Sequence, residues 1–386
     1  IELLRGKEFL RPVSVRTVSR EDHRRTVANW TNVTGDERAW NDQVWEALFV
    51  VGEDRDVTDE FATLYQGNVL GYYDPKTEDL VIITDGSLTI STYTLVHELV
   101  HALQDQHFDI ERPRYRGATQ DTQLATDGLV EGEAQYLTYR YLARCGTVWD
   151  CVNAGTRTAP AGANPNEGLL YTVLQPYSDG PVYVDSLVRN GGWAAVDARH
   201  ARPPVSTEEI LYPGQLPPTP FPDRWTARNG WVRYDAGVDG ADTVGEASMT
   251  VMFWYQARAH GIDVVDRGSL FATTTPFDSY NYTSVPAKGW AYDRLVPYHS
   301  PTVDEDAYVW QTEWDTVSDA IEFRDAYLTV LAGHGAVQVD ATTWVVRDGP
   351  FADAFRVVWN GRTVTVVNGP TVATLDDFSP GRGGET

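Results

Sequence analysis

One apolar helix with ionisable side chains constrains the fold more than any other segment of the chain. Residues 92–107 read TYTLVHELVHALQDQH, with Ser91 or Thr92 as a suitable N-cap. Side chains four positions apart lie on one face of a helix, so we expect His97 and His101 to lie side by side. Their apolar neighbours predict a core helix, with both imidazoles in a cleft rather than on a loose surface.

The segment His97-Glu98-Leu99-Val100-His101 has the HExxH pattern. Two imidazoles on one face can bind the same metal ion, and Glu98 lies beside that face, where it can accept a proton. A chain of this composition would contain the pattern by chance roughly 0.01 times. A core helix that buried these three side chains without a metal would need other hydrogen-bond partners for them. We therefore expect one zinc ion bound by His97 and His101, with Glu98 as the general base.

A catalytic zinc ion takes three protein ligands and keeps one position open, so a third ligand must come from elsewhere. Glu131 is the expected ligand, because it lies on the next predicted helix, residues 120–143, which can turn back antiparallel to the first. Gly128 and Gly132 flank Glu131 and would allow the two helices to approach closely at the metal.

Other carboxylates near this segment leave alternatives open. Glu133 and Glu246 are the substitute ligands. Carboxylates outside the ligand set usually orient the histidines of a zinc site, and the nearest in sequence are Asp127 and Asp105. Asp127 is the better candidate, because it lies one turn before Glu131.

The rest of the chain mixes both kinds of secondary structure, which predicts an α+β fold. Helices are predicted at residues 19–30, 38–51, 56–66, 92–107, 120–143, 243–259 and 316–331. Strands are predicted at residues 11–18, 69–73, 79–84 and in a hairpin over 354–368. The turn Asp74-Pro75-Lys76-Thr77 joins the second and third strands, and Asn360-Gly361 closes the hairpin.

A proline-rich stretch divides the chain. Residues 202–223 contain seven prolines, which exclude a regular helix or a central strand over this stretch, although Ser206-Thr207-Glu208-Glu209 could cap a short turn of helix within it. We therefore expect a catalytic region over residues 1–205, a connection over 206–223 and a C-terminal α+β region over 224–376.

The charge of the chain limits its partners and suggests its environment. Its 386 residues carry a formal net charge of −24, and only three of the 31 basic residues are lysines. Such a surface is typical of a protein from a halophile. It disfavours nucleic-acid binding, which needs clustered lysine and arginine. No apolar run is long enough for a membrane helix.

The two cysteines bear on localisation. Cys145 and Cys151 either close a small disulfide loop, as in an exported protein, or remain buried thiols. The chain begins at Ile1 rather than Met, so a missing leader says nothing about export. We expect an extracellular or cell-surface location, with a cytoplasmic one left open.

Two segments together resemble a known family. HELVH, followed by Val130-Glu131-Gly132-Glu133-Ala134, is similar to the gluzincin metallopeptidases, whose third zinc ligand is a glutamate on the following helix. The match covers residues 80–140 well. The strings GYYDPKTEDL, HELVHALQDQHFD and PPVSTEEILYP extend a weaker similarity, to bacterial and archaeal proteins labelled as metallopeptidases, over most of the chain.

The resemblance implies a zincin-like catalytic region, with a mixed sheet above the HExxH helix. It implies that His97, His101 and Glu131 bind zinc and that Glu98 is the base. In this family the strand before the active-site helix is a sheet edge that pairs with an extended peptide, so residues 80–84 would be that edge. The implied activity is zinc-dependent hydrolysis of peptide bonds in a peptide or protein substrate.

The chain also departs from the family. Thermolysin-like enzymes have an aspartate four residues after the third ligand, where this chain has Gln135, and the aminopeptidase GxMEN-type sequence is absent. The residue that stabilises the oxyanion cannot be placed by spacing. The candidates are Tyr183, Tyr139, Tyr212 and His200.

Two alternatives to an enzyme remain consistent with the sequence. A non-catalytic surface or assembly protein could keep a zinc ion for stability, although structural zinc sites usually have four ligands and favour cysteine. A carbohydrate-binding module would use the 13 Trp and 20 Tyr, although aromatic residues are more often found in the core. The oligomeric state is left open.

Overall fold

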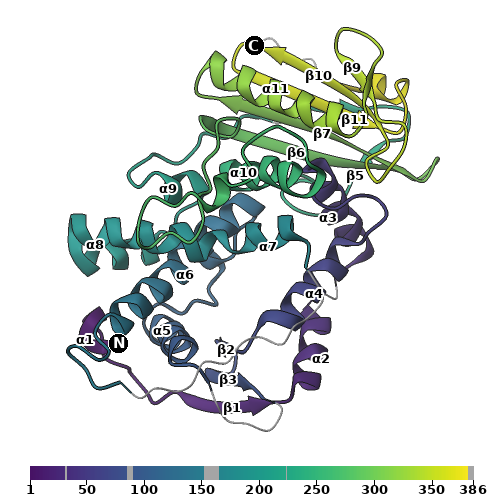
Figure 1. Cartoon of the computed structure of the whole chain (residues 1–386). Coiled ribbons are helices and arrows are strands. Elements are labelled where there is room, and N and C mark those ends of the chain that lie inside the picture. The colour runs from purple at the N-terminus through teal and green to yellow at the C-terminus, as the bar shows by residue number, and fades with distance from the viewer. Residues whose placement is uncertain (31–32, 85–89, 152–164, 223, 381–386) are drawn as a thin grey trace.

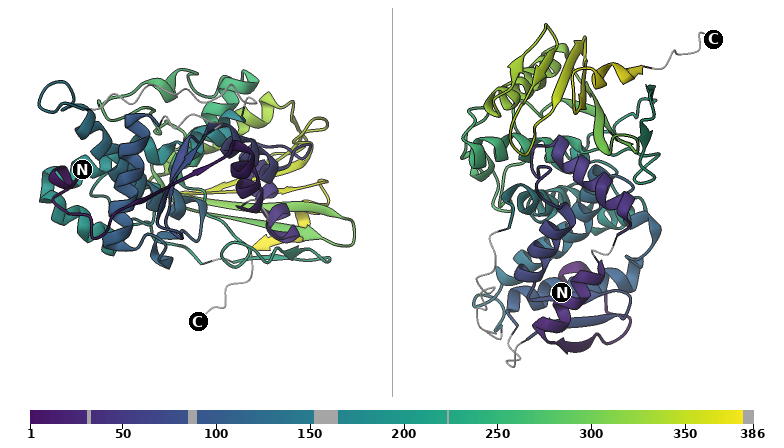
Figure 2. Two further views of the ribbon diagram at one scale, coloured as in Figure 1. Left: turned by 90° about the horizontal axis from the view of Figure 1, so that it is seen from below. Right: turned by 90° about the vertical axis from the view of Figure 1, so that its right-hand side faces the viewer.

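The computed structural model describes residues 1–30, 33–84, 90–151, 165–222 and 224–380. Figures 1 and 2 show a mostly helical first half at one end of the molecule and a large sheet with its helix at the other. Helices and strands occur together throughout the chain, so the prediction of an α+β fold is confirmed. No described helix combines the length and the apolar character needed to cross a membrane.

The first half contains nine α-helices among its described residues and one small sheet. The helices are α1 (Glu2–Arg5), α2 (Arg20–Trp30), α3 (Gly35–Ala47), α4 (Val57–Asn68), α5 (Thr92–Phe108), α6 (Gln120–Leu142), α7 (Glu167–Val173), α8 (Gln175–Ala201) and α9 (Thr207–Leu211). A 3-10 turn, Pro113–Tyr115, lies between α5 and α6. The strands are β1 (Ser14–Val18), β2 (Gly71–Asp74) and β3 (Asp79–Ile83).

The small sheet is mixed, and its strand order is β1-β3-β2. β3 pairs parallel to β1 and antiparallel to β2, so it is the central strand. The expectation that residues 80–84 form the sheet edge is therefore wrong. The reason is that β1, sixty residues earlier in the chain, occupies the outer side of β3. The edge beside α5 is β2, which packs directly against that helix.

The helices α5 and α6 begin where side-chain caps predict. Ser91 Oγ accepts from the Thr94 amide, and Thr119 caps α6 in the same way. The long helix α8 was not predicted, because it contains Pro181 and the non-helical residue Gly192. It packs along α6, and this contact is the most extensive one between any two helices of the described chain.

The second half is built on a seven-stranded antiparallel sheet of order β5-β6-β7-β11-β10-β9-β8. Its strands are β5 (Val232–Arg233), β6 (Trp290–Ser300), β7 (Glu305–Trp314), β8 (Val337–Gln338), β9 (Thr343–Val345), β10 (Ala354–Asn360) and β11 (Thr363–Gly369). The helix α11 (Val317–Gly333) packs on β7, β10 and β11. β4 (Trp225–Ala227) pairs with β12 (Phe378–Pro380) in a separate ribbon.

Shorter elements complete this half. The helix α10 (Gly245–Tyr255) continues into a π-helical turn, Gln256–His260. Single 3-10 turns cover Ser269–Phe271 and Thr374–Asp377. The hairpin predicted over residues 354–368 is β10 and β11, and β6 and β7 were not predicted.

The largest hydrophobic core contains residues from both sides of the proline-rich connection. Its members include Trp45 and Phe49 from the α3 segment, together with Trp310 and Tyr327 from the C-terminal sheet and α11. Within the connection, α9 is buried and packs on α6. The two halves of the chain therefore share one core. In the loop after α6, Cys145 and Cys151 are joined by a disulfide, which decides between the two readings of that pair.

Candidate metal centre and active site

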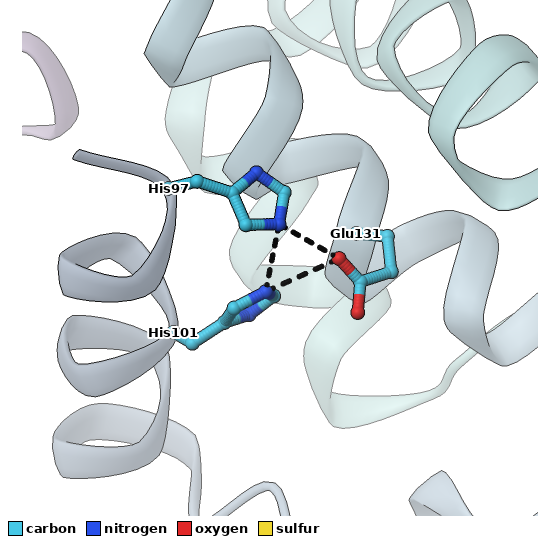
Figure 3. Close-up of side chains that lie close together, drawn as sticks. All are labelled: His97, His101 and Glu131. Carbon is cyan, nitrogen blue, oxygen red and sulfur yellow. Dashed lines mark hydrogen bonds and ion pairs between the residues drawn. The ribbon is translucent and has the colours of Figure 1, made fainter. Parts of the chain in front are cut away.

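Three predicted ligands converge between α5 and α6 (Figure 3). His97 Nε2 and His101 Nε2 lie 3.0 and 3.1 Å from Glu131 Oε2, and 3.1 Å from each other. The two histidines come from successive turns of α5, and Glu131 comes from the facing side of α6. The three atoms meet at one point because the i, i+4 spacing aligns the imidazoles and α6 packs against α5.

Gln104 fixes which nitrogen of His101 carries the proton. Its amide nitrogen donates to Val130 O at 2.9 Å and to Glu133 Oε2 at 3.0 Å, so its oxygen must face His101. That oxygen lies 2.9 Å from His101 Nδ1, which therefore carries the proton and donates it. In the neutral imidazole, Nε2 then presents a lone pair toward His97 and Glu131, as a metal ligand must.

The spacing of these donors fits a zinc ion. Ligands about 2.1 Å from a tetrahedral centre lie about 3.4 Å apart, so shifts of a few tenths of an ångström would suffice. Two imidazoles and one carboxylate are also the donor types that zinc prefers. Burial lowers the pKa of His101, but the Glu131 carboxylate outweighs it and raises that pKa to about 9. The group thus favours a positive charge at its centre.

Glu133, the first substitute ligand, belongs to a different buried network. Its carboxylate contacts Arg5 and Gln104, and it accepts from His200 Nε2 at 2.6 Å. His200 also lies 3.0 Å from the Tyr115 hydroxyl. Burial raises the pKa of Glu133, but the charges of His200 and Arg5 lower it to about 2. The network holds Gln104, and through it His101, rather than a metal ion.

Glu98 is placed as a base would be. Its Oε2 accepts from the backbone amide of Tyr73 in β2 at 2.9 Å, which anchors the carboxylate beside the two histidines. Burial raises the pKa of Glu98 above its usual value, against the opposing effect of His97 and His101. A carboxylate with a raised pKa accepts a proton from water more readily than an ordinary one.

A cavity of about 420 Å³ opens onto these groups. Its floor is formed by His97, Glu98, His101 and Glu131, and one wall is the strand β2 with the residues before it. Tyr177, on the first turn of α8, closes the other side, with its ring stacked on His97 at 5.9 Å. Burial and the charges of Glu131 and Glu98 raise the pKa of Tyr177 well above its usual value.

Sequence reasoning missed Gln104 and Tyr177. Gln104 lies three positions after His101 on the same helix, so helical spacing could have indicated it. Tyr177 lies far from the HExxH segment in sequence and reaches it only through the packing of α8 on α6. No local pattern marks it.

The predicted orienting carboxylates have other partners. Asp105 accepts from the Tyr73 hydroxyl at 2.8 Å and from the Ile110 amide. The bond from Tyr73 joins β2 to α5. Asp127 accepts from Gln123 Nε2 at 2.7 Å, and no hydrogen bond found among the described residues joins it to His97 or His101. Among the described residues, Gln104 is the side chain that orients His101.

The predicted oxyanion candidates do not line the cavity at Glu98. Tyr183 is buried between α6 and α8, and the ring of Tyr139 stacks on Phe277. The Tyr212 hydroxyl donates to Glu246 Oε1 at 2.6 Å. His200 binds Glu133, as described above, and Glu246 lies with Tyr212 away from the three convergent ligands.

Comparison with known proteins covers only the second half of the chain. Residues 233–379 match the model of a family described as a domain of unknown function (DUF8575). No curated protein sequence matches the chain. No solved structure matches it. All the residues of the candidate centre lie before the matched segment.

Proposed function

We propose that the protein is a zinc-dependent hydrolase of peptide bonds. The observation that supports this most is the convergence of His97 Nε2, His101 Nε2 and Glu131 Oε2 in a cavity that also holds Glu98. The contact of Gln104 with His101 Nδ1 adds to it, because it leaves Nε2 as the nitrogen with the lone pair in the neutral imidazole. The resemblance of the HELVH and VEGEA segments to gluzincins points to the same chemistry.

His97, His101 and Glu131 would hold the zinc ion, which as a Lewis acid makes water more acidic and polarises a carbonyl. Glu98 takes the proton from the attacking water and passes it to the departing amine, so that the peptide bond is cleaved with addition of one water. Tyr73 keeps the Glu98 carboxylate in place through its amide. The Tyr177 hydroxyl, which remains protonated because its pKa is raised, is our candidate donor to the developing oxyanion.

The strand β2 would align the substrate. Gly71, Tyr72 and Tyr73 line the cavity, and β2 is paired with β3 on one side only. An extended peptide can add to such a free edge by main-chain hydrogen bonds. The acidic, lysine-poor surface and the disulfide accord with a secreted enzyme that works in concentrated salt.

The decisive test is hydrolysis of an unbiased peptide mixture in molar KCl with zinc. We expect cleavage by the wild type, loss of cleavage in Glu98→Gln with zinc still bound, and a reduced rate in Tyr177→Phe. Glu322→Gln, an exposed substitution on α11, should behave as the wild type. Zinc binding without cleavage of any peptide would favour the alternative, a non-catalytic zinc protein. Full activity of Glu98→Gln would refute the assigned base.

A further inference from the structure

A second and larger cavity, of about 950 Å³, adjoins the one at Glu98. The two share Val69, Glu131 and Tyr177 in their walls, so they form one continuous cleft. The larger cavity is lined by residues of α3 and α4 and by residues of α7 and of the first half of α6. Figure 1 shows where these helices lie in the molecule. A polypeptide bound at the proposed zinc site would extend into this space.

The charged side chains of the larger cavity are all acidic. They are Glu37, Asp127, Glu131, Asp235 and Asp242. Among the described residues that line this larger cavity, none is lysine, arginine or histidine, whereas His97 and His101 line the smaller one. Glu131 is used by the two histidines, and Asp242 holds the backbone amides of Gln120 and Thr243.

Among the described residues, no basic side chain pairs with the remaining three carboxylates. Glu37 and Asp235 are exposed, and no ion pair found among the described residues joins either of them to a basic side chain. Asp127 accepts from one neutral donor, Gln123, and burial together with the Glu131 charge raises its pKa to about 7, so it carries only part of a charge at neutral pH. A cation beside any of these groups would gain electrostatic energy, and an anion would lose it.

Aromatic rings lie among these carboxylates. Tyr65 and Tyr177 line the cleft; one face of each ring stacks on a neighbour, Phe61 and His97 respectively, but the two residues are still 37% and 36% exposed, so part of each remains accessible to a ligand. Deeper in the wall, the ring of Trp45 packs edge-on against Phe61 at 5.7 Å. Aromatic faces attract guanidinium and ammonium groups, and their apolar surface accommodates the long stems of arginine and lysine.

We infer that this cleft binds the arginine- or lysine-bearing side of the polypeptide that the proposed site cleaves. The inference rests on the proposed function for the position of the scissile bond. The expected positive charge of the substrate is inferred from the residues that line the cleft. Carboxylates without a basic partner and partly exposed aromatic rings in the same cavity match a cationic side chain on a flexible stem, and the carboxylates repel aspartate and glutamate.

Binding can be measured without catalysis. Fluorescent peptides that differ only in having Arg, Gln or Glu at alternate positions are titrated into zinc-loaded Glu98→Gln protein in molar KCl, and anisotropy gives the Kd. We expect the Arg peptide to bind most tightly and the Glu peptide least. The added substitutions Glu37→Gln and Asp235→Asn should weaken the Arg peptide about twofold in molar KCl, where exposed charges are strongly screened, and about threefold to tenfold as the KCl is lowered, and they should leave the Gln peptide unchanged.

A charge-matched control separates the cleft from the bulk charge. Glu322→Gln with Asp263→Asn removes the same two charges from exposed positions that line no described cavity. This control should bind the Arg peptide as strongly as the parent does. Equal affinity for the Arg and Glu peptides, an equal loss in the control, or no saturable binding of the Arg peptide would each overturn the inference.

The two proposals can fail separately. If the wild type hydrolyses Gln and Arg peptides at the same rate, the hydrolase stands and the preference for cationic substrates is refuted. If the wild type cleaves nothing while the Arg peptide binds and responds to the cleft substitutions, the ligand class stands and the hydrolase is refuted.

Discussion

Replacing Gly132 by alanine would test how closely the helix that carries Glu131 must pack against its neighbour. A Cβ atom at Gly132 would lie 2.4 Å from the carbonyl carbon of Gly180 in α8, and 2.5 Å from its oxygen. Carbon atoms in contact are normally about 3.5–4.0 Å apart, so the deficit is about 1 Å. Both neighbouring atoms are backbone, so α6 and α8 must separate to make room.

The expected cost follows from two opposing terms. Overpacking a core usually costs about 1–3 kcal/mol, and alanine is better than glycine in a helix by about 1 kcal/mol. We therefore expect Gly132→Ala to lower the free energy of unfolding by up to about 2 kcal/mol. Glu131 is the preceding residue, so a shift of about 1 Å also moves it far beyond the roughly 0.2 Å that zinc coordination tolerates. Zinc affinity should fall by about tenfold or more.

Gly128→Ala is the matched control, one turn earlier on α6. Its Cβ would meet only the side chain of Ile210, at 3.1 and 3.2 Å, which can adjust, and it brings the same gain in helix propensity. Urea unfolding and a zinc-competition assay in the same KCl buffer compare the two variants. If Gly132→Ala is as stable as Gly128→Ala and binds zinc as tightly, the packing argument is refuted.

Two further predictions concern buried polar groups. Gln104→Leu should lower zinc affinity by about 10- to 100-fold, because it removes the acceptor that orients His101, whereas Gln106→Leu on the same helix should leave zinc affinity unchanged. Glu246 is buried, and desolvation raises its pKa to about 8, so it stabilises the fold while protonated and this contribution is lost as the pH rises toward 8. Glu246→Gln should remove roughly 3 kcal/mol of the loss in stability between pH 5 and pH 8, as measured by urea unfolding; an unchanged pH dependence would contradict this.

The parts of the site that the sequence could predict are those set by local helical geometry. His97, Glu98 and His101 lie on one helix, and their relative positions follow from its period. Glu131 was reached by adding one assumption, that the next helix turns back, and the structure brings it to the histidines. Its zinc-binding role stays a prediction.

The parts that the sequence could not predict depend on packing between distant segments. The glycines around Glu131 were expected to admit α5, but Gly132 faces Gly180 in α8 and Gly128 faces Ile210 in α9. A sequence shows that a helix carries small residues on one face. It does not show which segment of the chain packs against them. The helix α8 itself was missed because its glycines and Pro181 have low helix propensity, which packing against α6 overrides.

The matched C-terminal region has a physical connection to the cleft, although it supplies none of the zinc-site residues. The chain just after α3 places Phe49 among the rings of Tyr327, Phe351 and Phe355, and its carbonyl accepts from Gln256 Nε2 at 2.7 Å. The helix α3 thus lines the cleft and also contributes Trp40 and Trp45 to the core shared with the C-terminal sheet. The helix α6, which also lines the cleft, belongs to the pair of helices that carries the candidate ligands. The distance between Glu37 on α3 and Glu131 on α6 therefore depends on the C-terminal sheet as well as on the HExxH helix, and a change in that sheet should alter substrate binding without touching a candidate zinc ligand.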